Sequence, residues 1–166
     1  GCTNDWMMQD LASQAGVCSH AVGIGAVAFA QAGLKPLLTD VRLMVRPCDV
    51  LADGDEAGNK YAAVAQSQLS EQQQVRHHLT RFPAKDIEHY FYRQGFADIY
   101  RQIAGLPPAA GMNMHRVITR AIQRSSKPSL AIAVASAVAA RGVQSIPMLL
   151  RKMLGRVRGL AQGKHR

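Results

Sequence analysis

Three arginines at four-residue intervals are the most regular chemical feature of this 166-residue sequence. Arg116, Arg120 and Arg124 would lie on one face of a helix, because residues four apart are neighbours on a helix surface. Val117 and Ile118 fall on the opposite face. Guanidinium groups about 6 Å apart along a helix can contact successive phosphates of a nucleic acid. The same pattern also suits a solvated outer face, so the sequence leaves both interpretations open.

A second basic segment, residues 148–160, predicts an amphipathic helix. Leu150, Met153 and Leu154 begin an apolar stripe that continues through Val157 and Leu160. Helices of this kind bind nucleic acid, anionic lipid surfaces or grooves in partner proteins, and a terminal helix docked on the core is the plain alternative. Its basic residues, together with Lys127 before it, are candidate phosphate ligands: Arg151, Lys152, Arg156 and Arg158.

Aromatic residues gather beside arginines between residues 90 and 101. Tyr90, Phe91 and Tyr100 have the spacing of a helix face, which predicts that they lie in the core. Tyr92 and Arg93 fall off that face. An aromatic ring next to an arginine can stack on a nucleic-acid base, so these two are further candidate contacts.

No motif in the sequence fixes a catalytic activity. There is no phosphate-binding loop and no nucleophile elbow, and the Cys and His spacings do not match a structural zinc site. The Asp49–Asp55 segment has the glycine of a calcium loop but not the required oxygen ligands. We therefore expect an acidic turn able to pair with basic residues, no metal and no cofactor, and we favour a non-enzymatic protein.

The charge of the chain is distributed unevenly. It has 20 Lys and Arg against 11 Asp and Glu, a formal net charge of +9. Residues 1–83 are close to neutral, whereas residues 84–166 carry 14 basic and 3 acidic residues, and no acid follows Asp98. Soluble surfaces usually interleave both signs, so a long segment of one sign predicts a polyanionic partner.

Apolar spacing predicts helices in the middle and at the end of the chain. The middle helices span 59–82, ended by Pro83, and about 86–106, with a break at Gly95. Residues 41–46 read as a helix or an extended connector, because no second strand is evident to pair with them. The basic region predicts helices over 113–125, 129–141 and 145–161, with Pro128 in a first turn and Gly142 at an end.

These elements predict a mainly α fold, a small helical domain or bundle with a basic, Arg-rich C-terminal helical region. Three regions are expected, which could form one domain: the small-residue-rich 1–57, the two-helix 58–106 and the basic 113–166. Two apolar stretches, 17–38 and 129–150, are interrupted by polar or charged residues. A buried helix therefore suits the second stretch better than a membrane span.

The function these observations favour is binding of a polyanion, most of all a nucleic acid (DNA or structured RNA), through phosphate contacts. The alternative is a subunit of a membrane-associated assembly, anchored by the basic amphipathic helix 148–160. The three cysteines favour a reducing compartment, cytoplasmic or an organelle matrix, over a disulfide-stapled secreted scaffold.

Overall fold

The computed structural model describes residues 48–68, 77–108 and 111–162, and helices dominate them. This confirms the predicted mainly α class. A π-helical segment, η1 (Tyr92–Phe96), and a short 3₁₀ helix, η2 (Val143–Ser145), lie between the α-helices. In chain order the other elements are β1 (Cys48–Ala52), α3 (Glu56–Gln68), β2 (His77–Arg81), α5 (Ile87–Phe91), α6 (Ala97–Ile103), α7 (Met114–Ser125), α8 (Lys127–Arg141) and α9 (Met148–Ala161).

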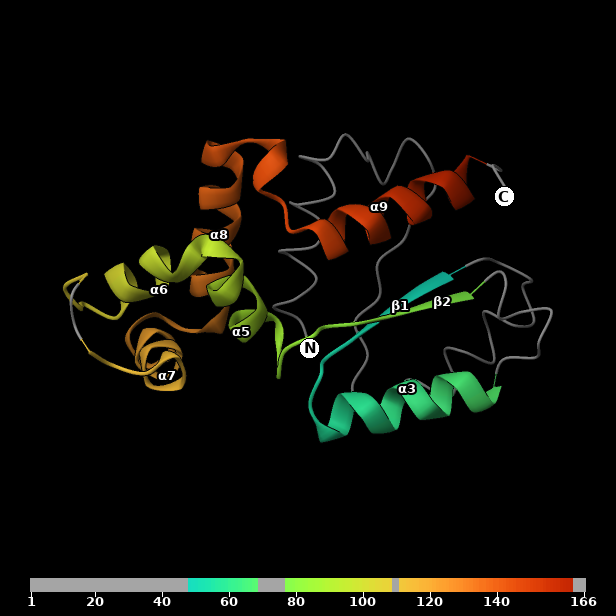
Figure 1. Ribbon diagram of the computed structural model, residues 1–166, viewed down its shortest axis with the longest axis horizontal. Coiled ribbons are helices and arrows are strands. Elements are labelled where there is room, and N and C mark those ends of the chain that lie inside the picture. The colour runs from blue at the N-terminus through green and yellow to red at the C-terminus, as the bar shows by residue number, and fades with distance from the viewer. Residues whose placement is uncertain (1–47, 69–76, 109–110, 163–166) are drawn as a thin grey trace.

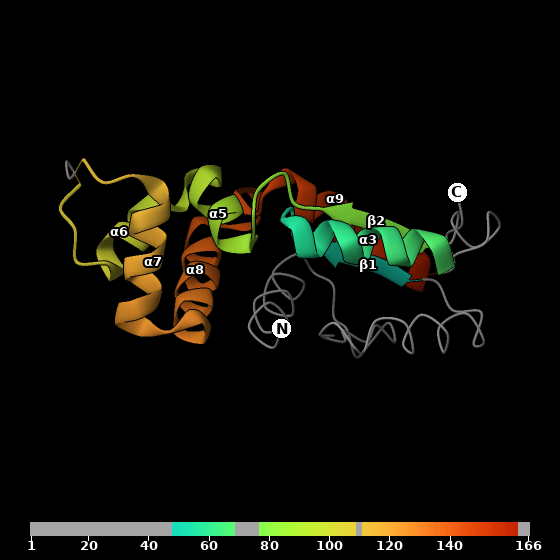
Figure 2. The same cartoon turned by 90° about the horizontal axis from the view of Figure 1, so that it is seen from below.

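The two strands form a parallel pair in which Val50 of β1 lies opposite Leu79 of β2. Parallel strands cannot be joined by a tight turn, and here α3 lies in the connection between them. Figures 1 and 2 show the strand pair lying between α3 and α9. Val50 packs with Ala65 of α3, so the strand pair and this helix share a small core of their own.

The predicted helix over 59–82 is wrong in its last part. Leu79, which the apolar spacing assigned to a helix face, lies in β2. Val75 and Leu79 are four residues apart and fit a helical period, but the strand is stabilised by pairing with β1, which lies far away in the sequence. The expected connector over 41–46 lies outside the described residues.

The helices from α5 to α8 pack around the main core, which α9 completes. As predicted, Tyr90, Phe91 and Tyr100 are buried in it. Asp86 caps the start of α5, and the helical path breaks at Gly95, whose φ of 94° suits glycine. Leu150 and Leu154 bring the apolar side of α9 into the same core.

The three predicted C-terminal helices are present. Asn113 caps α7 by accepting a hydrogen bond from the backbone N–H of Arg116 at 2.9 Å. Pro128 stands in the first turn of α8 and Gly142 ends it, as predicted. The last helix begins at Met148 rather than near 145, because η2 and Pro147 precede it. None of the helices in the described ranges is long and apolar enough to cross a membrane.

Candidate functional site

Acidic side chains gather where β1 and β2 end. Asp53 and Asp55 follow β1, and Asp86 and Glu88 follow β2. Because the strands are parallel, both loops lie at the same edge of the pair, the edge at which α/β proteins commonly bind ligands. We call these four residues the carboxylate cluster.

Gly54 allows the two loops to approach each other closely. Its backbone N–H donates to the carbonyl oxygen of Ala84 at 3.1 Å. A Cβ at this position would lie 2.2 Å from that oxygen and 2.5 Å from the carbonyl oxygen of Phe82. Any larger residue would push the loops apart, so glycine here holds the two pairs of acids together.

Two of the four carboxylates are also helix caps. Asp55 Oδ1 accepts from the backbone N–H of Gly58 at 2.7 Å, at the start of α3. Asp86 Oδ1 accepts from the backbone N–H of His89 at 2.8 Å and lies 2.6 Å from the Nδ1 ring atom of His89. These contacts fix both side chains in place. Among the described residues, no such capping bond is made by the Asp53 side chain.

Electrostatics single out Asp53. Its burial, and next the carboxylates of Asp86, Asp55 and Glu88, raise the pKa of Asp53 to about 6. Burial also opposes ionisation of Asp86, but hydrogen bonds from His89 hold the pKa of Asp86 below its ordinary value. Carboxyl groups whose pKa values are driven apart in this way are typical of functional sites.

Lys127, in the first turn of α8, brings a positive charge to this cluster. Its Nζ lies 3.3 Å from Oε1 of Glu88, whose side chain is 9% exposed. The same ammonium opposes the upward shift in the pKa of Asp53. The structure therefore places this predicted phosphate ligand beside carboxylates and not on the arginine face of α7.

The hydroxyl of Tyr100 is buried nearby without a hydrogen-bond partner among the described residues. Burial and the negative charges of Glu88 and Asp86 raise the pKa of Tyr100 above its ordinary value. A buried hydroxyl without a partner is unusual, because it loses its hydration without replacing it. The negative charges of Glu88 and Asp86 therefore act on this hydroxyl, although it donates a hydrogen bond to neither.

Clustered carboxylates can take a proton from water or bind a hard cation such as Mg²⁺. In the described ranges, no three His, Cys, Asp or Glu side chains are grouped so that they could hold a metal ion by themselves. A cation held here would therefore need further oxygen ligands from water or from a bound phosphate, which is the usual way in which proteins hold Mg²⁺.

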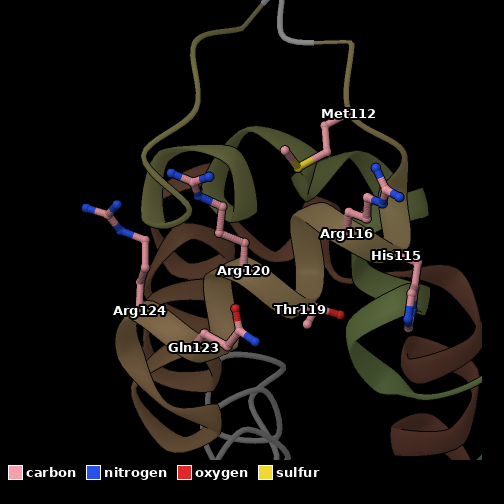
Figure 3. Close-up of a pocket in the computed structure, with 7 residues that line it drawn as sticks. All are labelled: Met112, His115, Arg116, Thr119, Arg120, Gln123 and Arg124. Carbon is pink, nitrogen blue, oxygen red and sulfur yellow. The ribbon is translucent and has the colours of Figure 1, made fainter.

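The second candidate feature is the exposed side of α7. As predicted, Arg116, Arg120 and Arg124 share one face, and they line a hollow of about 590 Å³ to which no acidic side chain of the described residues contributes. Figure 3 shows their guanidinium groups on one side of the helix, with Met112 between two of them. The hollow is completed by Thr119, Gln123 and His115. We call this surface the α7 arginine face.

Contacts inside the protein orient two of these arginines. Arg120 Nε donates to the carbonyl oxygen of Ala104 at 2.9 Å, which leaves its other guanidinium nitrogens available. The guanidinium of Arg124 lies over Gly105, where a Cβ would come within 3.1 Å of Cζ. The arginine face is therefore partly preorganised, which lowers the entropy lost when an anion binds.

A line of polar groups joins the two features. His89, bonded to Asp86, lies with its Nε2 3.3 Å from Nδ1 of His115, and the two rings stack with centroids 5.5 Å apart. His115 also lines the hollow of the arginine face. Asp86, His89 and His115 thus form a chain from the carboxylate cluster to the edge of α7.

Arg156 of α9 is engaged inside the protein. Its Nε and Nη2 donate to Oδ2 of Asp49 at 3.1 and 2.9 Å, and its Nη2 donates to Oγ1 of Thr80 at 2.5 Å. The Asp49 side chain is 1% exposed. The acidic segment therefore does pair with a basic residue of the C-terminal half, as the sequence suggested, and we leave Arg156 out of the proposed interface.

The other predicted contacts do not line the hollow of the α7 arginine face. Arg93, Lys152 and Arg158 are exposed. Tyr92 is half-buried, and its ring packs edge-to-face with the ring of Tyr100, with centroids 5.6 Å apart. The part of the Tyr92 ring that contacts Tyr100 is therefore closed to a nucleic-acid base. Arg151 lies beside η2, where its Nη1 donates to Oε1 of Gln144. Of the predicted contacts in the described residues, only the three arginines of α7 line this hollow.

Sequence reasoning missed the carboxylate cluster. The local signal was weak: Asp55 and Asp86 each stand directly before a helix, but residues 48–52 and 77–81 hold few of the β-branched and aromatic residues that favour strands. Predicting the cluster required assigning residues 77–81 to a strand that pairs in parallel with residues 48–52, because only parallel pairing brings the two loops to one edge.

Comparisons with known proteins give one relative and no function. The chain is similar to the uncharacterized protein YbjD of Escherichia coli (strain K12), with 48% identity over 165 residues. The alignment covers 99% of this chain and 30% of that protein, so the chain spans under a third of the length of the curated relative it matches. No family model and no solved structure matches the chain.

Proposed function

We propose that this protein binds the phosphate backbone of a nucleic acid through the α7 arginine face. The observation that carries the proposal is the placement of Arg116, Arg120 and Arg124 around one hollow that no described acidic residue lines. Thr119 and Gln123 line the same hollow, and their hydroxyl and amide groups can donate to phosphate oxygens. Such contacts position a duplex or a folded RNA without reading its sequence.

Salt dependence tests this proposal, because each phosphate that is neutralised releases counterions. Fluorescence anisotropy with a labelled mixed-sequence DNA duplex should give an affinity that falls steeply between about 50 and 200 mM salt. Arg116→Gln/Arg124→Gln should lower the slope of log affinity against log salt by about 2, since each contact contributes about 0.9. Arg120 is left unchanged because of its bond to Ala104.

The matched control is Lys152→Gln/Arg158→Gln, which removes two exposed charges from α9. It should change the slope by less than about 0.5, the effect of a weaker overall field. Equal slopes for the two double variants would show that the protein's total charge, and not α7, governs binding. An affinity that barely changes with salt would refute phosphate binding altogether.

A second candidate function is hydrolysis of the bound phosphodiester at the carboxylate cluster. Asp53, with a pKa of about 6, is suited to accept a proton from water near neutral pH. The water oxygen would bond to phosphorus, the P–O ester bond would break, and the leaving oxygen would take a proton from solvent. Lys127 beside the cluster could offset the negative charge that develops. This candidate departs from the non-enzymatic expectation because the sequence alone did not bring these acids together.

Cleavage of a labelled oligonucleotide, followed with MgCl₂ and with EDTA in parallel, tests the second candidate. Asp53→Asn should lower the rate at least about 100-fold, in line with loss of a general base. The control Glu56→Gln changes the neighbouring exposed acid, which pairs with Lys60 at 2.7 Å, and should keep the rate within about twofold. Equal rates in Asp53→Asn and the unaltered protein would reject hydrolysis at this cluster and leave nucleic-acid binding intact.

The membrane-assembly alternative predicts binding through the apolar stripe of α9. Leu150, Met153 and Leu154 of that stripe are buried in the core. We therefore expect the protein to stay at the bottom of a flotation gradient with vesicles of anionic phospholipid. Flotation in 150 mM salt would favour this alternative over nucleic acid.

A further inference from the structure

A separate hollow of about 330 Å³ lies where α8 ends and α9 begins. Figure 1 shows this junction, at which η2 carries the chain from one helix to the next. Arg141, Gln144, Met148 and Arg151 are among its lining residues, and no acidic side chain is. It shares no residue with the α7 arginine face or the carboxylate cluster.

Arg151 presents an incompletely bonded edge in this hollow. Its Nη1 donates to Oε1 of Gln144 at 2.6 Å. Its Nη2 meets only the sulfur of Met148, at 3.9 Å, and its Nε is buried without a hydrogen-bond partner in the described part of the chain. A thioether is a weak acceptor, so the edge formed by Nε and Nη2 lacks an oxygen to bind.

That edge is the part of a guanidinium that binds an oxyanion with two parallel hydrogen bonds. Leaving a buried donor unpaired destabilises the protein, and an acceptor that reaches it would recover this loss. The sulfur of Met148 lies beside Nη2 of Arg151. Met148 is 55% exposed, and its unbranched side chain is flexible enough to move aside.

The surroundings favour an anion. Arg141 donates to the carbonyl oxygen of Gly95 at 2.8 Å, and its guanidinium lies 4.7 Å from the ring centroid of Phe96, so its position is fixed. Its ion pair with Asp98 offsets part of its charge, but Asp98 does not line the hollow. The N-terminus of the 14-residue α9 opens here with no acid in its first turn, and its dipole adds positive potential.

We propose that this hollow binds a phosphate group on the Nε and Nη2 edge of Arg151, with the Met148 side chain displaced. A phosphate has enough oxygens to accept from Arg151 while lying near Arg141 and the start of α9. Free inorganic phosphate and the terminal phosphate of an oligonucleotide carry the same group. The proposal does not depend on nucleic-acid binding by α7.

The side-chain Nε–H signal of Arg151 in ¹H–¹⁵N NMR spectra reports directly on this edge. Titration with inorganic phosphate, at ionic strength held constant with NaCl, should move the signal along a saturable curve. A 5′-phosphorylated DNA decamer and the same decamer without its phosphate form the other two arms. A shift at lower concentration for the phosphorylated decamer than for inorganic phosphate supports the site and identifies the terminal phosphate as the better source.

Two variants separate binding from folding. Arg151→Gln should weaken phosphate binding about tenfold or more, read from backbone amides around residues 144–148, whereas the matched control Lys152→Gln should change it less than about twofold. If Arg151→Gln fails to fold, Met148→Glu keeps Arg151, changes a side chain that is already exposed, and should abolish binding by filling the edge with a carboxylate.

Either of two results would overturn the proposal. One is a shift of the Nε–H signal that does not saturate up to about 50 mM phosphate, well above a Kd of about 1 mM. The other is an equal response to phosphate in the unaltered protein and Met148→Glu, which would place any bound phosphate elsewhere.

Discussion

Arg156 of α9 donates two hydrogen bonds to one carboxylate oxygen of Asp49 in β1, although the two residues are 107 positions apart in the chain. The Asp49 side chain is almost fully buried. Thr80 of β2 joins them, donating to Asp49 Oδ1 at 3.1 Å. The contact ties the last helix to both strands. It therefore holds α9 against the side of the strand pair opposite α3 (Figures 1 and 2).

Removing Arg156 should destabilise the fold strongly, because the buried carboxylate of Asp49 loses the two charge-assisted hydrogen bonds that Arg156 donates. We expect Arg156→Gln to lower the free energy of unfolding by about 3 kcal/mol in urea denaturation. Arg158→Gln, an exposed change on the same helix, should stay within about 0.5 kcal/mol.

A double-mutant cycle separates this ion pair from other effects of the substitution. Asp49→Asn/Arg156→Gln should lose at least about 1 kcal/mol less than the sum of the two single variants. Additive losses, or a loss under about 0.5 kcal/mol for Arg156→Gln alone, would contradict a stabilising pair.

Asp53 should make stability depend on pH. Its pKa in the folded protein, about 6, lies above the ordinary value of 3.8. The folded state therefore binds the proton more tightly, so this contribution to stability is present below about pH 4 and is lost as pH rises through 6. Asp53→Asn removes the dependence and should be more stable than the unaltered protein above that range.

Thermal unfolding from pH 4 to 8 checks this prediction. Because Asp53 is partly exposed, solvent screening reduces the expected difference at pH 7.5 to about 1 kcal/mol. The difference should vanish near pH 4. A difference that is constant across the range would mean that the substitution acts through packing and not through the charge.

Gly54→Ala should separate the two acidic loops. The added Cβ would meet the Ala84 and Phe82 carbonyl oxygens, so the backbone must shift, at a cost of about 2 to 3 kcal/mol. As the loops part, the pKa of Asp53 should fall towards 3.8, which a ¹³C NMR titration of its carboxyl carbon measures. Gly111→Ala has open space around it and should change stability by less than about 0.5 kcal/mol. An unchanged titration of Asp53 would show that the loops do not depend on Gly54.

Gly155→Ala should stabilise the protein. This glycine lies within α9, no atom of the described residues comes within 4 Å of the position its Cβ would take, and alanine favours a helix by about 0.5 to 1 kcal/mol. Gly95→Ala also has open space, yet it should destabilise by about 1 kcal/mol because its φ is 94°. Urea denaturation of both variants tests the pair, and effects of the same sign would contradict the backbone explanation.

The helical part of this protein could be read from local sequence. Asp86 begins α5, Gly95 breaks the helix, and Pro128 and Gly142 bound α8, because caps, glycine and proline act on their own backbone. The shared face of the α7 arginines was equally predictable, since a helical period places residues four apart on one side. The burial of Tyr90, Phe91 and Tyr100 was predictable from the same helical spacing.

What local sequence did not provide was the strand pair and everything that depends on it. His77–Arg81 becomes a strand by pairing with Cys48–Ala52, and that pairing brings the acids of two loops to one edge. The partners of Arg156 and Lys127 also come from distant segments. Sequence by itself determined the approximate bounds of α7 and α8 and where the basic residues lie along the helices, but not where α3 ends or where α9 begins. Only tertiary structure decided which charges neutralise one another and which stay free, because ion pairing depends on distance in space and not on separation in the chain.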